Sequence, residues 1–232
     1  MRSLSGLAVP VLVVALLAGC AGAAPTPTAT PTVPSATPTP TPTPTVAAPV
    51  KPTVGELVLS PNGLGPLVIG QAPPVTDPAI DVLVYDPTVC QWAVDEGYIT
   101  DPGMWIANYP RPDRDSAGPF GVAIDSRLLA IGIFDNSIST DRQIHLGSTA
   151  AELQAAYPGE LELLTDYEGG DTHLYRLAGT AGDLYIDVLI PESVPYYPEY
   201  GGEVVVRMTV LPKASVPPGF NSDYSLGYCV SA

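Results

Sequence analysis

The chain has 232 residues, 24 of them acidic and 9 basic, so its formal net charge at pH 7 is −15. A surface of this charge repels phosphate backbones and anionic headgroups, which argues against nucleic-acid binding and electrostatic docking on membranes. The hydrophobic fraction of 46% is ordinary for a globular protein, so we expect a core that needs no metal or other cofactor.

The N-terminus carries an apolar run from Leu7 to Ala18, preceded by one positive charge at Arg2 and followed by small residues and Cys20. About a dozen helical residues cover roughly 18 Å, which is short of the ~30 Å hydrocarbon core. We therefore expect a cleaved signal peptide over residues 1–19. An ordinary secretory signal followed by an incidental cysteine is the alternative.

The residues Leu17-Ala18-Gly19-Cys20 resemble the lipobox of bacterial lipoproteins, with an aliphatic residue three positions before the cysteine and a small residue directly before it. The resemblance implies that Cys20 receives a diacylglyceryl thioether and becomes the mature N-terminus. More than one acyl chain, such as palmitate, is needed to hold a protein firmly in a bilayer. The expected partner is thus the lipid bilayer, and the expected location is the extracytoplasmic face of the cell membrane.

Residues 20–53 comprise Cys20 and a tether from Ala21 to Thr53 that consists mostly of Thr, Pro and Ala. Proline removes amide donors and fixes φ, so we expect neither helix nor sheet here. Polyproline II geometry gives a reach of up to roughly 100 Å. This low-complexity linker would hold a folded domain, expected over residues 54–232, away from the bilayer, and its composition also suits O-glycosylation.

Two cysteines, Cys90 and Cys229, remain as an even pair if Cys20 is acylated. Disulfides persist outside the cytosol, so we predict a bridge between them. The bridge would pin the segment after Pro212, which has no periodic pattern and would otherwise fray. Two separate thiols are the alternative.

The first half of the domain has mostly strand patterns. Four short strands are expected at residues 56–59, 104–109, 120–124 and 128–134. Asp77-Pro78 has the form of a helix start, but the β-branched residues in 80–85 favour a strand about equally. Cys90-Gln91-Trp92 is expected to be irregular.

The second half has a clearer pattern. Thr149 can cap a helix, with Glu152 as its capping-box partner, and Pro158-Gly159 ends the helix. Five strands are expected at residues 143–146, 161–167, 172–177, 184–190 and 204–211. Alternation in 184–190 predicts one buried and one half-exposed face. The fold class expected is α+β, mainly antiparallel sheet meanders with one or two short helices.

One short pattern recurs. Residues 65–73 and 142–150 each contain a short apolar strand closed by glycine, which suggests two pseudo-repeated halves, 54–141 and 142–232. Such openings resemble the strand–glycine–helix openings of β-lactamase-inhibitor-like and outer-membrane assembly lipoprotein modules. The resemblance covers one short segment in each half, so it implies an α+β module and no functional residue.

The sequence contains two histidines, which limits the catalytic and metal sites that it could form. His145 and His173 are the only histidines, and no Gly-x-Ser-x-Gly turn is present. We therefore expect no Ser-His-Asp hydrolase and, with Cys90 and Cys229 paired, no zinc site. No catalytic residue, metal ligand or cofactor is predicted.

The segment 195–202 places Tyr196, Tyr197 and Tyr200 among prolines and glycines. Rigid aromatic area with hydroxyl groups is typical of glycan or protein recognition, whereas rings folded back onto the sheet end are the alternative. The sequence therefore predicts a non-enzymatic binding or accessory domain of the cell envelope. Two alternatives stay open: an envelope hydrolase using Asp and Glu carboxylates, and an inhibitor or assembly partner.

Overall fold

The computed structural model describes residues 49–111, 118–164, 170–215, 226 and 229, all of which belong to one compact unit. The predicted signal peptide, Cys20 and the tether as far as residue 48 lie outside the described residues. The described part is mostly antiparallel sheet with two short helices, so the predicted α+β class is confirmed. Among these residues no helix is long and apolar enough to cross a bilayer.

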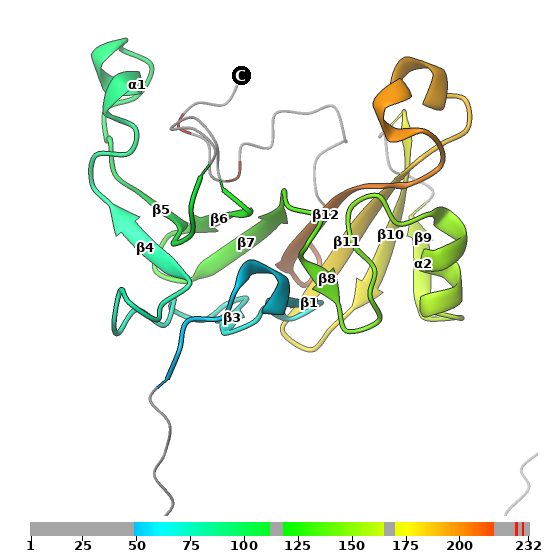
Figure 1. The fold of residues 1–232 in the computed structure, drawn as a ribbon, viewed down its shortest axis with the longest axis horizontal. Coiled ribbons are helices and arrows are strands. Elements are labelled where there is room, and N and C mark those ends of the chain that lie inside the picture. The colour runs from blue at the N-terminus through cyan, green and yellow to red at the C-terminus, as the bar shows by residue number, and fades with distance from the viewer. Residues whose placement is uncertain (1–48, 112–117, 165–169, 216–225, 227–228, 230–232) are drawn as a thin grey trace, which may run out of the picture. The chain divides into compact units, whose positions relative to one another are not determined.

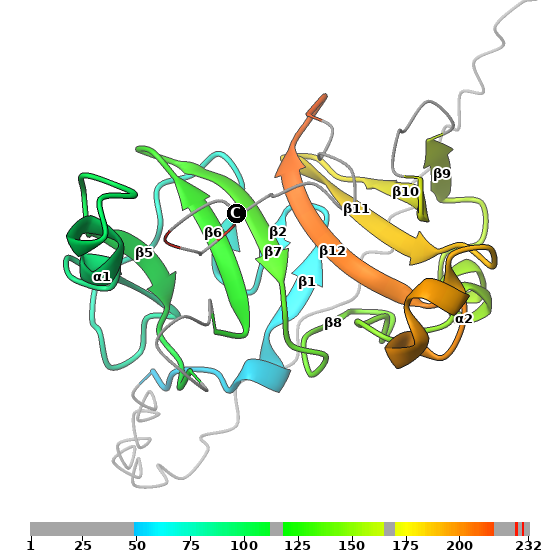
Figure 2. The same cartoon turned by 90° about the horizontal axis from the view of Figure 1, so that it is seen from above.

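The largest sheet has six strands, and every neighbouring pair in it is antiparallel. Its spatial order is β6 (Phe120–Ile124), β7 (Leu128–Ile133), β12 (Val205–Pro212), β11 (Gly182–Leu189), β10 (Thr172–Ala178) and β9 (Leu161–Leu164). Figure 2 shows β12 lying between β7 and β11. The strands therefore come from both segments that were considered as repeated halves.

Two smaller sheets complete the strand inventory of the described residues. One has the order β3 (Leu67–Val68), β2 (Gly63–Leu64), β1 (Val58–Ser60) and β8 (Ser139–Thr140). In it, β1 pairs with β8 in parallel, across a long stretch of sequence. The other sheet is the antiparallel pair β4 (Leu83–Asp86) and β5 (Met104–Ala107).

The helical elements are short. They are α1 (Gln91–Asp95), α2 (Ala150–Ala156) and the 3-10 turns η1 (Val54–Glu56), η2 (Val194–Tyr196) and η3 (Pro198–Tyr200). Figure 1 shows α1 and α2 at opposite ends of the folded unit. Of the two helices, only α2 contributes side chains to the main core.

Helix α2 begins as predicted. Thr149 Oγ1 accepts from the amide of Glu152 at 3.2 Å, and Glu152 Oε2 accepts from the amide of Thr149 at 2.8 Å. These reciprocal bonds satisfy two amides that the first helical turn leaves open. Leu153 and Tyr157 are buried against the core, so one face of the helix packs on the sheets.

Strand β11 is buried on both faces, which corrects the predicted half-exposed face. Leu184, Ile186 and Val188 join the main core, which also contains residues of the four-stranded sheet. Tyr185 points to the opposite face, where it clusters with Leu226 of the C-terminal segment. The alternation pattern of β11 could not predict that Leu226 covers its second face, because Leu226 is far away in sequence.

Two local predictions are wrong. Residues 143–146 form no strand; instead the amide of Ile144 donates to Thr140 Oγ1 at 3.1 Å and its carbonyl accepts from the amide of Thr140 at 2.8 Å. These bonds close a turn where a strand was expected. Cys90-Gln91-Trp92 is not irregular but leads into α1, in which Ala93 is fully buried.

Asp77-Pro78 begins a turn rather than a helix, and β4 follows it. The Asp81 carboxylate accepts from the amides of Thr76 and Asp77, at 2.6 and 2.8 Å. A side chain that binds these amides competes with a helical hydrogen-bond ladder. The strand alternative for this region is therefore the one adopted.

Contacts with the folded part begin before Val54. Lys51 Nζ donates to the carbonyl of Asn108 at 2.7 Å, and the hydroxyl of Tyr109 donates to the carbonyl of Pro52 at 2.9 Å. Lys51 Nζ also lies 5.1 Å from the centre of the Tyr109 ring. The residues just before η1 are thus attached to the loop that follows β5.

Candidate functional site

A groove of about 670 Å³ lies where β7 ends and β12 begins. The segment directly after β7 contributes Phe134, Asp135 and Asn136 to its lining. Gly147 comes from the loop before α2, and Tyr200 comes from η3. Three connections that are distant in sequence thus build one surface hollow.

Two aromatic side chains give the groove its character. Phe134 is 39% exposed and Tyr200 is 37% exposed, so part of each ring faces solvent. The amide of Phe134 donates to the carbonyl of Pro119 at 3.0 Å, which fixes its backbone at the end of the β6–β7 hairpin. Partly exposed rings on a fixed backbone offer flat apolar area to a ligand at low entropic cost.

Polar groups accompany the rings. Asp135 Oδ1 accepts from the amide and the hydroxyl of Ser137, at 2.8 and 2.7 Å, so its carboxylate is held in one orientation. A tyrosine hydroxyl is protonated at neutral pH, and burial, with the nearby Glu199 and Tyr197, raises the pKa of Tyr200 further. The groove therefore combines apolar surface with an acceptor and a donor.

The three tyrosines predicted as a binding surface have different surroundings. Tyr197 donates its hydroxyl to Asp171 Oδ2 at 3.2 Å, and Ser193 Oγ donates to Asp171 Oδ1 at 2.7 Å. Tyr200, 6.4 Å from Tyr197 between ring centres, lines the groove. Tyr196 is 79% exposed and is not among the lining residues.

Sequence reasoning did not find Phe134. It ends the strand expected over residues 128–134, and its pattern does not distinguish it from the apolar residues before it. Its exposure follows from its position just beyond Ile133, where the β6–β7 pairing stops. No periodic signal marks a residue that leaves a sheet, so only the spatial arrangement reveals it.

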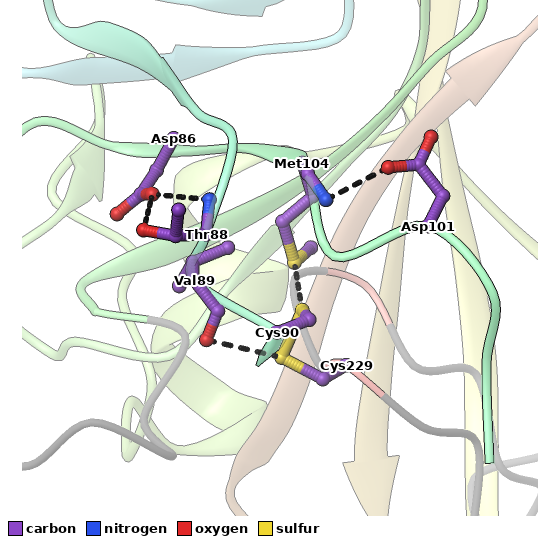
Figure 3. The surroundings of a disulfide bond; sticks show 8 residues. Asp86, Thr88, Val89, Cys90, Asp101, Met104 and Cys229 are labelled. Carbon is purple, nitrogen blue, oxygen red and sulfur yellow. Dashed lines mark hydrogen bonds between the residues drawn. A yellow bond between two sulfur atoms is a disulfide. The ribbon is translucent and has the colours of Figure 1, made fainter. Parts of the chain in front are cut away.

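Cys90 and Cys229 form a disulfide, as the sequence predicted, with their Cα atoms 5.3 Å apart. Cys90 is buried directly before α1, and Cys229 is half-buried. Met104 Sδ lies 3.3 Å from Cys90 Sγ; because both cysteines are oxidised, this is a sulfur–sulfur contact and not a hydrogen bond. Figure 3 shows Met104 Sδ on the side of Cys90 Sγ opposite Cys229.

A second hollow, of about 510 Å³, opens onto this disulfide. Both cysteines line it, together with Met104 and the segment Tyr98 to Asp101. The disulfide is therefore not enclosed by the core on every side.

The histidines have ordinary structural surroundings. His145 Nδ1 lies 2.8 Å from the carbonyl of Leu146, and the His173 ring packs edge-on against Tyr175. Within the described ranges, no three His, Cys, Asp or Glu side chains are grouped as metal ligands.

Compared with protein-family models, curated proteins and solved structures, the chain matches none of them. Its class therefore rests on its own fold and site: an α+β domain with an aromatic groove and a disulfide-held C-terminal segment.

Proposed function

We propose that the protein is a bacterial lipoprotein, anchored by acylated Cys20 on the extracytoplasmic face of the cell membrane, and that its folded domain binds a ligand of the envelope. Two features support the compartment: the lipobox Leu17-Ala18-Gly19-Cys20 and the disulfide between Cys90 and Cys229. Disulfides are rare in reducing cytosol and common outside it. The proline-rich tether would let the domain reach ligands at a distance from the bilayer.

The observation that carries the binding role is the pair of exposed rings, Phe134 and Tyr200, in one groove. The net charge of −15 disfavours anionic ligands, so the ligand proposed is a neutral glycan segment. Sugar rings present apolar faces to aromatic side chains and hydroxyls to groups such as Asp135. This chemistry matches the lining of the groove.

The hydrolase alternative has less support. Cleavage by paired carboxylates needs two acids about 5 to 9.5 Å apart across the scissile bond. Each of the two hollows has one acidic side chain among its described lining residues, Asp135 in the groove and Asp101 beside the disulfide. A binding role therefore fits the described lining better than hydrolysis.

Titration of the mature protein with neutral, soluble cell-wall oligosaccharides tests the proposal by calorimetry. Phe134→Ala and Tyr200→Ala are each expected to weaken binding about tenfold or more, as loss of a central aromatic contact does. Tyr196→Ala is the matched control, since it removes an exposed tyrosine of the same segment outside the groove.

Equal losses in all three variants would show that the segment, and not the groove, carries recognition. Absence of glycan binding, with capture of an envelope protein that depends on Tyr200, would replace the glycan by a protein ligand. Glycan cleavage during the titration would favour the hydrolase.

A further inference from the structure

On the face of the six-stranded sheet opposite the main core, Gly121 and Gly132 form a shallow position that Leu226 occupies, here called the glycine seat. Gly121 of β6 and Gly132 of β7 are direct cross-strand partners on this face. A Cβ on Gly121 would collide with the carbonyl of Leu226, and a Cβ on Gly132 would lie 2.9 Å from Leu226 Cδ1. The paired glycines thus leave the space that Leu226 fills.

Leu226 covers apolar side chains that the sheet would otherwise present to water. It is 5% exposed and clusters with Ala130, Leu174, Tyr185 and Leu211. The hydroxyl of Tyr185 also donates to the carbonyl of Ser215, just after β12. Ser215 and Leu226 therefore both contact this face, and Cys229, three residues after Leu226, is bonded to Cys90.

The disulfide offers one of its two sulfurs to an incoming thiolate. Thiol–disulfide exchange needs the attacking sulfur to approach in line with the S–S bond, from the far side of the sulfur attacked. Met104 Sδ already occupies that side of Cys90 Sγ (Figure 3). Both cysteines line the open hollow, but Cys90 is 2% exposed whereas Cys229 is half-buried, so the Cys229 sulfur is the one within reach.

We propose that Cys229 is the attack site for an exported protein dithiol, and that reduction there releases Leu226 from its glycine seat. The first thiolate of the dithiol bonds to Cys229 Sγ, and the S–S bond breaks with its electron pair on Cys90 Sγ. The second thiolate attacks the mixed disulfide and frees Cys229 as a thiolate. The dithiol is oxidised to a disulfide, the protein bond is reduced, and water protonates both cysteines.

The residues that reduction would release contribute no strand to the six-stranded sheet. Among the described residues, every strand ends at or before Pro212. Reduction should therefore uncover the outer face without unfolding the domain. Reduction or oxidation of this bond by thiols of the envelope would therefore determine whether the apolar face under Leu226 is exposed or covered.

The test uses the full oxidised protein in native buffer with reduced glutathione, followed by quenching and peptide mapping. The mixed disulfide is expected on Cys229. With dithiothreitol, reduction should leave the far-ultraviolet circular dichroism of the sheet in place and raise the fluorescence of a hydrophobic dye. An adduct on Cys90, loss of the sheet signal, or reduction only in denaturant would each overturn the proposal.

Two variants tie the reactivity to the seat. Gly121→Ala overpacks the position under Leu226, and Leu226→Ala removes the side chain that fills it. Each should speed native-state reduction about tenfold or more, because overpacking and cavity formation both favour the undocked segment. Gly202→Ala is the control, since a Cβ there meets nothing within 4 Å. This variant should be reduced at the rate of the wild-type protein. Unchanged rates in both seat variants would refute the coupling.

Discussion

Arg207 and Asp187 are direct cross-strand partners in β12 and β11, and Arg207 Nε donates to Asp187 Oδ2 at 2.8 Å. The Asp187 residue is only 1% exposed, and the hydroxyl of Thr172 donates to its other oxygen at 2.9 Å. A carboxylate removed from water is tolerated because it is paired and hydrogen-bonded. This ion pair therefore joins the two middle strands of the large sheet.

The first prediction concerns that pair. Arg207→Met removes the charge opposite Asp187 and should lower the free energy of unfolding by about 3–5 kcal/mol, measured by urea denaturation. The double variant Asp187→Leu, Arg207→Met should recover most of the loss, because apolar replacements of a buried pair are often neutral. A double variant as unstable as the single one would show that the two charges are not coupled.

The disulfide should contribute strongly to stability. It closes a loop with a sequence separation of 139. In the chain-entropy description, such a loop corresponds to about 4–5 kcal/mol, so Cys229→Ser should shift the urea midpoint clearly downward. Hydrogen exchange should show loss of protection first around Ser215 and Leu226, before the β9–β11 meander. A midpoint equal to that of the wild type would contradict this.

The N-terminal limit of the folded part can be tested by truncation. Removal of residues 21–48 should leave the melting temperature unchanged. Removal as far as Pro52 deletes the bonds to Asn108 and Tyr109 and the cation–π contact of Lys51, together worth about 1–2 kcal/mol. For a domain of this size, that loss lowers the melting temperature by about 2–8 °C. If the two truncated proteins have the same melting temperature, these contacts contribute nothing to stability.

Acylation of Cys20 is tested by mass spectrometry of protein extracted from membranes. The mature chain should begin with an acylated cysteine, and Cys20→Ala should release the protein or stall its processing. Cys90→Ser serves as the control, since it should alter the disulfide but not the anchor. A free Cys20 thiol, or a mature start at another residue, would disprove the lipoprotein assignment.

The cap of α2 should make stability depend on acidity. Hydrogen bonds from the Thr149 amide, then its hydroxyl, lower the pKa of Glu152 below its ordinary value of 4.5. A lowered folded-state pKa gives stability that is present above the unfolded value and is lost as pH falls through the folded one. Glu152→Gln keeps an acceptor that does not titrate, so thermal melts should show a weaker decline from about pH 5 to pH 3.

The control for that experiment is Glu192→Gln, which changes an exposed carboxylate outside the cap. It should keep the pH dependence of the wild-type protein. Parallel curves for wild type and Glu152→Gln would show that the cap does not contribute to acid sensitivity.

Elements with local signals were predicted from the sequence. The β6–β7 hairpin follows from two apolar runs around a short polar turn, and α2 follows from the Thr149–Glu152 cap. The strands of the β9–β11 meander follow from apolar runs separated by hairpin-length connections. In each case the residues that determine the structure are neighbours in sequence.

Features with distant partners were not predicted. Strand β1 pairs with β8, Leu226 packs against Tyr185, and Phe134 and Tyr200 line the same groove. Each of these features joins segments that are far apart in the chain. Periodicity reports whether a residue is suited to burial, but it does not report which remote segment buries it. The predicted tyrosine segment therefore supplied one lining residue of the groove, and the fold supplied the others.

The central position of β12 has a consequence for folding during synthesis. The β6–β7 hairpin and the β9–β11 meander are translated first, and β7 and β11 each have an unpaired edge until β12 is made. Assembly of the large sheet must then wait until nearly the whole chain has been synthesised. A translation product that stops before Val205 would leave β7 and β11 without the strand that joins them, and such unpaired edges favour association with other chains.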